Sequence, residues 1–165
     1  MVNIVKIQQS FVYTCSPNIS KVSRIYQESI FYHSKSCLIS LIHGLSSQNF
    51  GYDTLRRGCN HILEFRKEFV STEFPLFLDS SGYSIISGAV SSRNTWKFID
   101  CYTQALDWLK DDIDYVFQLD IPIFLNEPDN CTKKNIYDYN KKSIENSIEC
   151  IKKNPQLEDK FIAIL

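Results

Sequence analysis

The sequence predicts an α/β fold in which about four parallel strands are joined by crossover helices. Short apolar runs alternate with longer segments whose apolar residues recur at helical spacing, from residue 37 to residue 165. These helical segments are long enough to connect parallel strands by right-handed crossovers. Hydrophobic residues make up 44% of the 165 residues, which suits one globular domain with a substantial core.

Residues 1–36 are rich in Ser, Tyr and Asn and show no regular apolar period, so we expect an irregular N-terminal extension with one short hairpin or helix at most. The first residues contain neither a continuous apolar segment nor a small-residue cleavage site, which favours a cytoplasmic protein over a secreted one. No apolar run approaches the roughly 18 residues of a membrane span, and no membrane partner is expected.

The first half of the repeating region predicts two strands and one helix. The run CLISLIHGL, residues 37–45, is a buried-strand candidate that ends near Gly44. Leu55, Cys59 and Ile62 then fall on one face of an amphipathic helix that extends to Val70. The run PLFLD, residues 75–79, is the second strand.

The second half predicts two helices and two further strands. Asn94 is a plausible N-cap, and Thr132 is another. The strand DYVFQLDIPIF, residues 114–124, lies between the two helices, and KFIAIL, residues 160–165, follows them. The apolar side of the first helix is expected to consist of Trp96, Ile99, Tyr102, Leu106 and Leu109, and the narrow apolar seam of the second of Ile136, Tyr139, Ile144, Ile148 and Ile151.

Four strands in this length correspond to about half of a (β/α)8 barrel, because a full barrel typically needs about 250 residues. A dinucleotide-binding fold is the weaker alternative, since no glycine-rich phosphate-binding turn follows the first strand. The six cysteines are widely spaced and include no C-x-x-C pair, so we expect reduced structural thiols and no metal site. The net charge of −1 indicates no general attraction to nucleic acid.

Two acidic residues follow strands, where parallel α/β folds collect functional groups. Asp79 ends PLFLD, and Asp120 follows DYVFQL. The turn after Asp79 contains Ser80, Ser81 and Gly82, whose N–H groups can point into a cavity, and Tyr83 offers a ring for stacking on a planar ligand. Each residue also has a plain structural interpretation: the acids as turn or cap residues, and the tyrosine as a core side chain.

The segment LFLDSSGYSIISG resembles the D-S-G-G-[FY]-Q segment of tRNA-guanine transglycosylases, and DYVFQLDIP is similar to a later strand of that family. The resemblance covers roughly residues 37–165 and extends to relatives that insert deazaguanines into DNA. It implies the N-terminal half of a (β/α)8 barrel that exchanges guanine for a 7-deazaguanine in tRNA or DNA.

Carried over residue by residue, the resemblance implies that Asp79 is the catalytic acid that transfers a proton or orients the substrate. It implies that Ser80, Tyr83 and Asp120 bind the base, with Tyr83 stacking on its face. Asp120 would accept hydrogen bonds from the N1–H and the exocyclic amine of guanine, a donor pair that one carboxylate can accept.

Several positions depart from the family pattern. Ser81 stands where the family has Gly, Ser84 where Gln is usual, and Pro122 where the tRNA enzymes have Cys. These changes favour a divergent member, such as a phage-encoded or DNA-directed enzyme. The family's aspartate nucleophile and its Cys/His zinc site belong to the second half of the barrel, so we expect no cofactor in this chain and no exchange activity from the chain alone.

The expected partners are therefore a guanine or 7-deazaguanine base, tRNA or DNA, and a second chain that completes the barrel. A gene fragment, a split subunit and a truncated reading frame all fit this expectation. Two alternatives stay open: a non-catalytic partner subunit of such an enzyme, and an unrelated α/β domain whose acids bind another small ligand.

Overall fold

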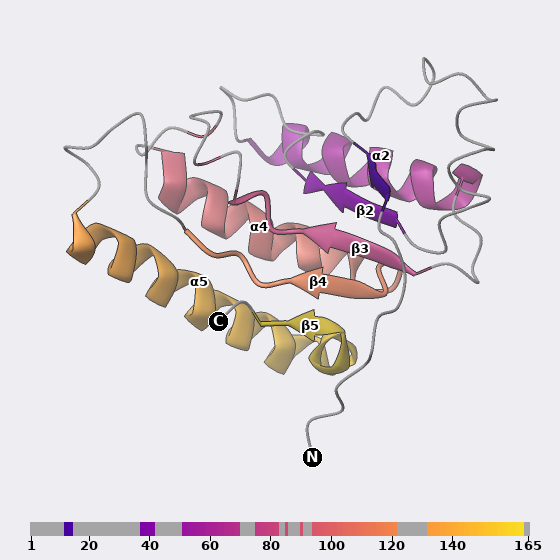
Figure 1. The fold of residues 1–165 in the computed structure, drawn as a ribbon. Coiled ribbons are helices and arrows are strands. Elements are labelled where there is room, and N and C mark those ends of the chain that lie inside the picture. Colours follow the sequence, from indigo (N-terminus) through magenta and orange to yellow (C-terminus); the bar gives the residue numbers. More distant parts are fainter. Residues whose placement is uncertain are drawn as a thin grey trace.

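The computed structural model describes residues 12–14, 37–41, 51–69, 75–82, 85, 90, 94–121 and 132–163. These residues form an α/β fold around one parallel sheet, which confirms the predicted class (Figure 1). Its five strands lie side by side in chain order and each neighbouring pair is parallel. The strands are β1 (Val12–Thr14), β2 (Cys37–Ser40), β3 (Leu76–Asp79), β4 (Tyr115–Phe117) and β5 (Phe161–Ile162).

Strand β1 is one more strand than the sequence predicts. It lies within the expected irregular extension and pairs with β2, Val12 opposite Cys37. Its three residues are too few to show an apolar period, so only the neighbouring strand marks it as sheet. The remainder of residues 1–36 lies outside the described part of the chain.

Three α-helices, α2 (Tyr52–Phe69), α4 (Thr95–Leu109) and α5 (Lys133–Lys153), pack against one face of this sheet (Figure 1). A 3₁₀ helix, η5 (Pro155–Lys160), links α5 to β5. The register partners Ile39 and Leu78, with Val116 on the next strand, share one buried core with all three helices. A doubly wound sheet reverses its strand order and covers both faces, whereas this sheet winds in one direction only.

The opposite face of the sheet carries the alternate residues of each strand. On β3, Phe77 and Asp79 alternate with the core residues Leu76 and Leu78. The ring of Phe77 stacks on that of Tyr115, with centroids 4.8 Å apart. Asp79 lies opposite Ser40 of β2 in the register, so polar residues succeed the aromatic layer at the carboxyl edge.

The buried face of α4 differs from the prediction at its first turn. Trp96 is 45% exposed and packs against Tyr139 of α5, with ring centroids 4.7 Å apart. Phe98, one turn before Tyr102, fills the core instead. Asn94 occupies the N-cap position, but its side chain makes no capping hydrogen bond because its backbone is already helical.

The predicted apolar seam of α5 is wrong at two of its five positions. Ile144 and Ile148 are 44% and 47% exposed. The buried residues are instead Tyr139, Ser143, Ser147 and Cys150. The N-cap prediction is confirmed, since the side chain of Thr132 accepts a hydrogen bond from the Asn135 N–H at 3.1 Å.

The third predicted strand is shorter than expected. Strand β4 ends at Phe117, and residues 118–121 continue without strand structure. Asp120 therefore lies three residues beyond the strand, on a segment that must find most of its hydrogen bonds outside the sheet.

Candidate functional site

The tight turn after β3 begins at Asp79. Ser81 has a φ of 62°, in the left-handed region, so the chain reverses sharply there. The Asp79 carboxylate accepts a hydrogen bond from the Ser81 N–H at 3.2 Å, and the Gly82 N–H donates to the Ser80 hydroxyl at 3.4 Å. Both N–H groups are therefore used within the turn, whereas the sequence suggested that they point into a cavity.

Asp120 meets this turn from the next strand along the sheet. The Ser80 hydroxyl donates to one Asp120 carboxylate oxygen at 3.3 Å. A Cβ atom added at Gly82 would lie 3.0 Å from that same oxygen, so only glycine allows the carboxylate to approach so closely. Strand β2 contributes Ser40, whose hydroxyl lies 2.6 Å from the Ser81 hydroxyl.

The charge state of Asp79 is set by its surroundings. Burial raises the pKa of its carboxyl above the usual value of 3.8, and the nearby charge of Asp120 raises it further. Hydrogen bonds from Ser81, Ser40 and Ser80 oppose this rise without cancelling it. A partly buried carboxyl with a raised pKa, lying beside a second carboxylate, is a recurrent arrangement for proton transfer.

Tyr102 of α4 lies close to both acids and was predicted only as a core residue. It is 1% exposed, and its hydroxyl donates to the Phe117 carbonyl at 2.6 Å. Burial, followed by the charges of Asp79 and Asp120, raises the pKa of this phenol well above 10. The hint in the sequence is a tyrosine on an otherwise apolar helix face, since a buried hydroxyl needs a partner.

The structure thus brings three of the four predicted site residues to one edge of the sheet: Asp79, Ser80 and Asp120. The fourth, Tyr83, lies outside the described residues. Sequence reasoning missed Ser40 and Tyr102. A serine directly after the apolar residues of CLIS was the available signal for Ser40.

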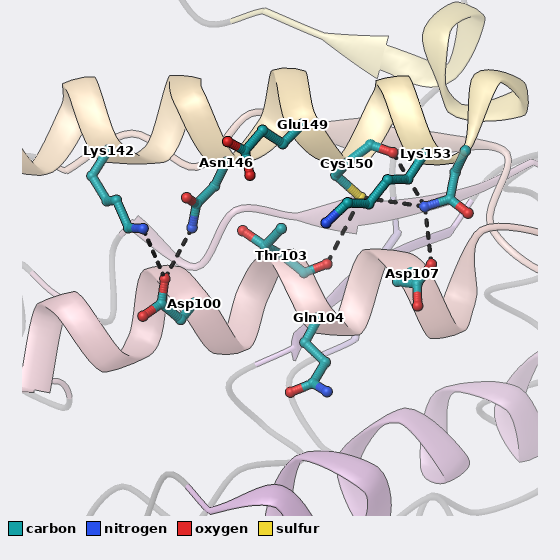
Figure 2. A pocket seen from close by; sticks show the side chains of 10 residues that line it. Asp100, Thr103, Gln104, Asp107, Lys142, Asn146, Glu149, Cys150 and Lys153 are labelled. Carbon is teal, nitrogen blue, oxygen red and sulfur yellow. Dashed lines mark hydrogen bonds and ion pairs between the residues drawn. The ribbon is translucent and has the colours of Figure 1, made fainter.

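A concave groove lies on the helical side of the molecule, and neither acid lines it. It is a groove of about 390 Å³ between α4 and α5. Figure 2 shows Lys142 and Asn146 reaching from α5 to Asp100, at 3.5 and 3.0 Å. Cys150 lies farther along the groove, and burial raises the pKa of its thiol. The polar groups of this groove largely satisfy one another, which is typical of a helix–helix contact.

The described residues contain neither a candidate metal site nor a helix that could span a membrane. No three His, Cys, Asp or Glu side chains gather there in a way that could hold a metal ion. None of the helices described is long and apolar enough to cross a membrane. The described free cysteine Cys59 is also a poor nucleophile, because burial, with a contribution from Cys101, raises the pKa of its thiol to about 12.

Comparison with known proteins adds no family to this geometry. No protein-family model matches the sequence, and no curated protein or solved structure matches it significantly.

Proposed function

We propose that this chain supplies the base-recognition side of a transglycosylase-like site, for the exchange of guanine with a 7-deazaguanine in tRNA or DNA. One observation carries the proposal: Asp79 and Asp120, from successive strands, meet at a single turn at the carboxyl edge of a sheet that winds in one direction. An arc with this strand order and helices on one face is the arrangement of part of a (β/α)8 barrel, whose sites lie at this edge.

Asp120 is the recognition residue in this proposal. A carboxylate has about four acceptor positions on its two oxygens, so the hydrogen bond from Ser80, the one it receives from the described residues, leaves room for the two donors of a guanine edge. Ser80 holds one oxygen and thereby orients the carboxylate before the base arrives. Such prior orientation lowers the entropy that binding must overcome.

Asp79 is the proton-transfer residue. Its raised pKa increases the fraction of the protonated form near neutral pH, and general acids work best when their pKa lies near the working pH. Base exchange also needs a nucleophile that holds the ribose. The resemblance assigns that nucleophile to no residue of this sequence, so base binding rather than turnover is the property to measure.

Calorimetric titration with three matched ligands tests the proposal. 7-Deazaguanine presents both donors, 7-deazahypoxanthine lacks the exocyclic amine at C2, and 7-deaza-2-aminopurine keeps that amine but lacks the N1–H. We expect 7-deazaguanine to bind best, with each missing donor costing about 1–3 kcal/mol, roughly 5- to 150-fold in affinity.

Asp120→Asn should remove the preference for 7-deazaguanine, because an amide offers one acceptor and one donor to an edge that has two donors. Asp159→Asn, an exposed change on η5, is the matched control and should bind like the natural protein. Equal binding of all three ligands would instead favour the unrelated small-ligand domain.

A further inference from the structure

The segment that carries Asp120 is held by side chains rather than by the sheet. Beyond β4, the Gln118 N–H still donates to the Ile162 carbonyl at 2.9 Å. From there on, helix α5 provides the partners. The Leu119 carbonyl accepts a hydrogen bond from the buried hydroxyl of Ser143. Buried backbone groups rarely lack partners in folded proteins, so these contacts determine whether the segment can lie there at all.

Asn140 binds the residue on the other side of Asp120. Its amide oxygen accepts from the Ile121 N–H at 2.8 Å, and its amide nitrogen donates to the Ile121 carbonyl at 3.0 Å. A side-chain amide has the same donor and acceptor as a peptide group. Asn140 therefore takes the place that a neighbouring strand would occupy. The same nitrogen also donates to the Ile136 carbonyl, which fixes the side chain on its own helix.

These contacts explain the unusual composition of the α5 surface. A helix against a core normally buries its large apolar residues. Here Ser143 is 2% exposed while Ile144, the next residue, is 44% exposed. Rotating the helix to bury Ile144 would remove the serine from the Leu119 carbonyl. The helix face is thus determined by the hydrogen bonds to the residues on either side of Asp120 together with the burial of Tyr139 and Cys150.

We propose that Asn140 and Ser143 are positioning residues that determine where the Asp120 carboxylate lies relative to Asp79. They hold the backbone immediately before and after Asp120, and neither bonds to the carboxylate itself. The position has little tolerance, because even a Cβ atom added at Gly82 would lie 3.0 Å from a carboxylate oxygen and the Ser80 hydroxyl contacts the same oxygen. Functional side chains generally need placement within about 0.5 Å. The role in base recognition rests on the proposed function, but the positioning does not.

The test compares three alanine variants by nuclear magnetic resonance titration of the Asp79 carboxyl. Ser143→Ala and Asn140→Ala should lower the pKa of Asp79 towards its usual value, because water then reaches the carboxyl more easily and a displaced Asp120 repels its charged form less. Ser147→Ala is the matched control. This serine is also buried on α5, but among the described residues its hydroxyl donates to the Ser143 carbonyl of its own helix alone, at 2.9 Å.

Affinity for 7-deazaguanine is the second readout. It should fall about 10- to 100-fold in Ser143→Ala and Asn140→Ala, the loss that supporting residues commonly cause at metal sites. Ser143→Thr, which retains the hydroxyl, should recover most of it. If the natural protein binds no deazaguanine, the proposed function fails while the titration still tests the positioning. An Asp79 pKa unchanged in both variants, or equally changed in Ser147→Ala, would overturn the inference.

Discussion

Asp79 lies at the proposed site, in a position that is unfavourable for its charged form. Its raised pKa means that the fold prefers the neutral carboxyl, so the stability from that preference is present below the usual pKa and is lost as the pH rises through the folded-state value. Near pH 7 the charged form is partly buried beside Asp120. Carboxylates arranged in this way commonly reduce the stability of a fold in exchange for activity.

We therefore expect Asp79→Asn to raise the urea midpoint of unfolding at pH 7. The gain should shrink as the pH is lowered towards 3.8, where the natural residue is itself becoming neutral. Asp159→Asn, which replaces an exposed acid, should show no such pH-dependent gain. A variant less stable than the natural protein at every pH would contradict this explanation.

Gly82 is the residue whose side chain must be absent. We expect Gly82→Ala to weaken 7-deazaguanine binding about tenfold, because the new methyl would lie 3.0 Å from the Asp120 carboxylate and push it aside. The loss of unfolding free energy should be smaller than the loss of binding free energy, because the end of the Asp120 side chain can move away from the methyl more easily than backbone could. Gly51→Ala is the control, because a Cβ atom there meets nothing within 4 Å. Equal binding losses in both variants would argue against a role for this close approach.

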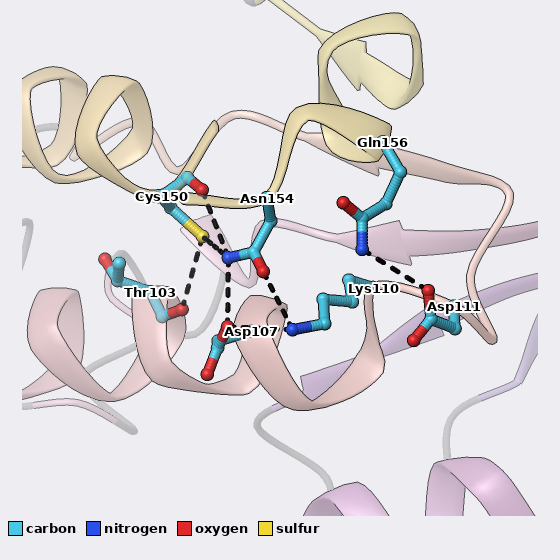
Figure 3. A network of polar contacts seen from close by, with 7 residues as sticks. All are labelled: Thr103, Asp107, Lys110, Asp111, Cys150, Asn154 and Gln156. Atoms are coloured by element: carbon cyan, nitrogen blue, oxygen red, sulfur yellow. Dashed lines mark hydrogen bonds and ion pairs between the residues drawn. The ribbon is translucent and has the colours of Figure 1, made fainter. Parts of the chain in front are cut away.

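At the scale of elements, Asn154 joins the C-terminal ends of α4 and α5 (Figure 3). It is 5% exposed, and its amide donates to Asp107 at 2.9 Å and to the Cys150 carbonyl at 3.1 Å. Lys110 donates to its amide oxygen at 2.8 Å. One buried side chain thus links groups from both helices, and its partner Asp107 is half-exposed.

Asn154→Ala should lower the free energy of unfolding by about 1 kcal/mol, because it removes the hydrogen bonds of a buried amide to Asp107 and Lys110. Gln156→Ala removes a 3.4 Å contact from an exposed residue and should stay within about 0.5 kcal/mol. The hydrogen bond from Asn154 is also the main cause of the lowered pKa of Asp107. The stability that this hydrogen bond gives the fold is lost as the pH falls through the lowered pKa. The difference in unfolding free energy between the natural protein and Asn154→Ala should therefore become smaller in acid, as urea unfolding at several pH values would show.

Local patterns were sufficient to predict the elements whose cause is local. Thr132 caps α5 because its own hydroxyl reaches the Asn135 N–H. Asp79 and Asp120 lie near each other because the carboxyl ends of neighbouring parallel strands share one edge. The buried face of α5 depends instead on the Leu119 carbonyl, a partner 24 residues away, and no helical period contains that information. Strand β1 likewise depends on its pairing with β2.

At the scale of the whole molecule, α5 presents an exposed apolar stripe of Tyr137, Ile144 and Ile148, which are 66%, 44% and 47% exposed. Spacings of seven and four residues place them on one face. Strands β1 and β5 form the two edges of the described sheet, and such edges can pair with other chains. We expect the protein to self-associate at micromolar concentration through the apolar stripe of α5.

The double change Ile144→Lys with Ile148→Lys should shift sedimentation velocity profiles towards the monomer while leaving the unfolding midpoint nearly unchanged. Glu145→Lys alters the net charge by the same two units on the same helix without removing an apolar group, so it is the matched control. Dissociation by the control to the same extent would attribute the effect to charge repulsion and not to the stripe.

The strand order described above also bears on how the chain is made. Each strand from β2 onwards pairs with the strand that precedes it in the sequence, so one of its partners has already been synthesised when it emerges from the ribosome. Once α4 and β4 have been synthesised, the central core residues Leu78, Phe98 and Val116 are all present in the chain. The residues that position the acids are synthesised later. Asp120 follows β4 by three residues, but Asn140 and Ser143 emerge about 20 residues after Asp120. Strands β1 to β4 can thus pair during translation, whereas the geometry of the carboxyl edge is completed only when α5 docks.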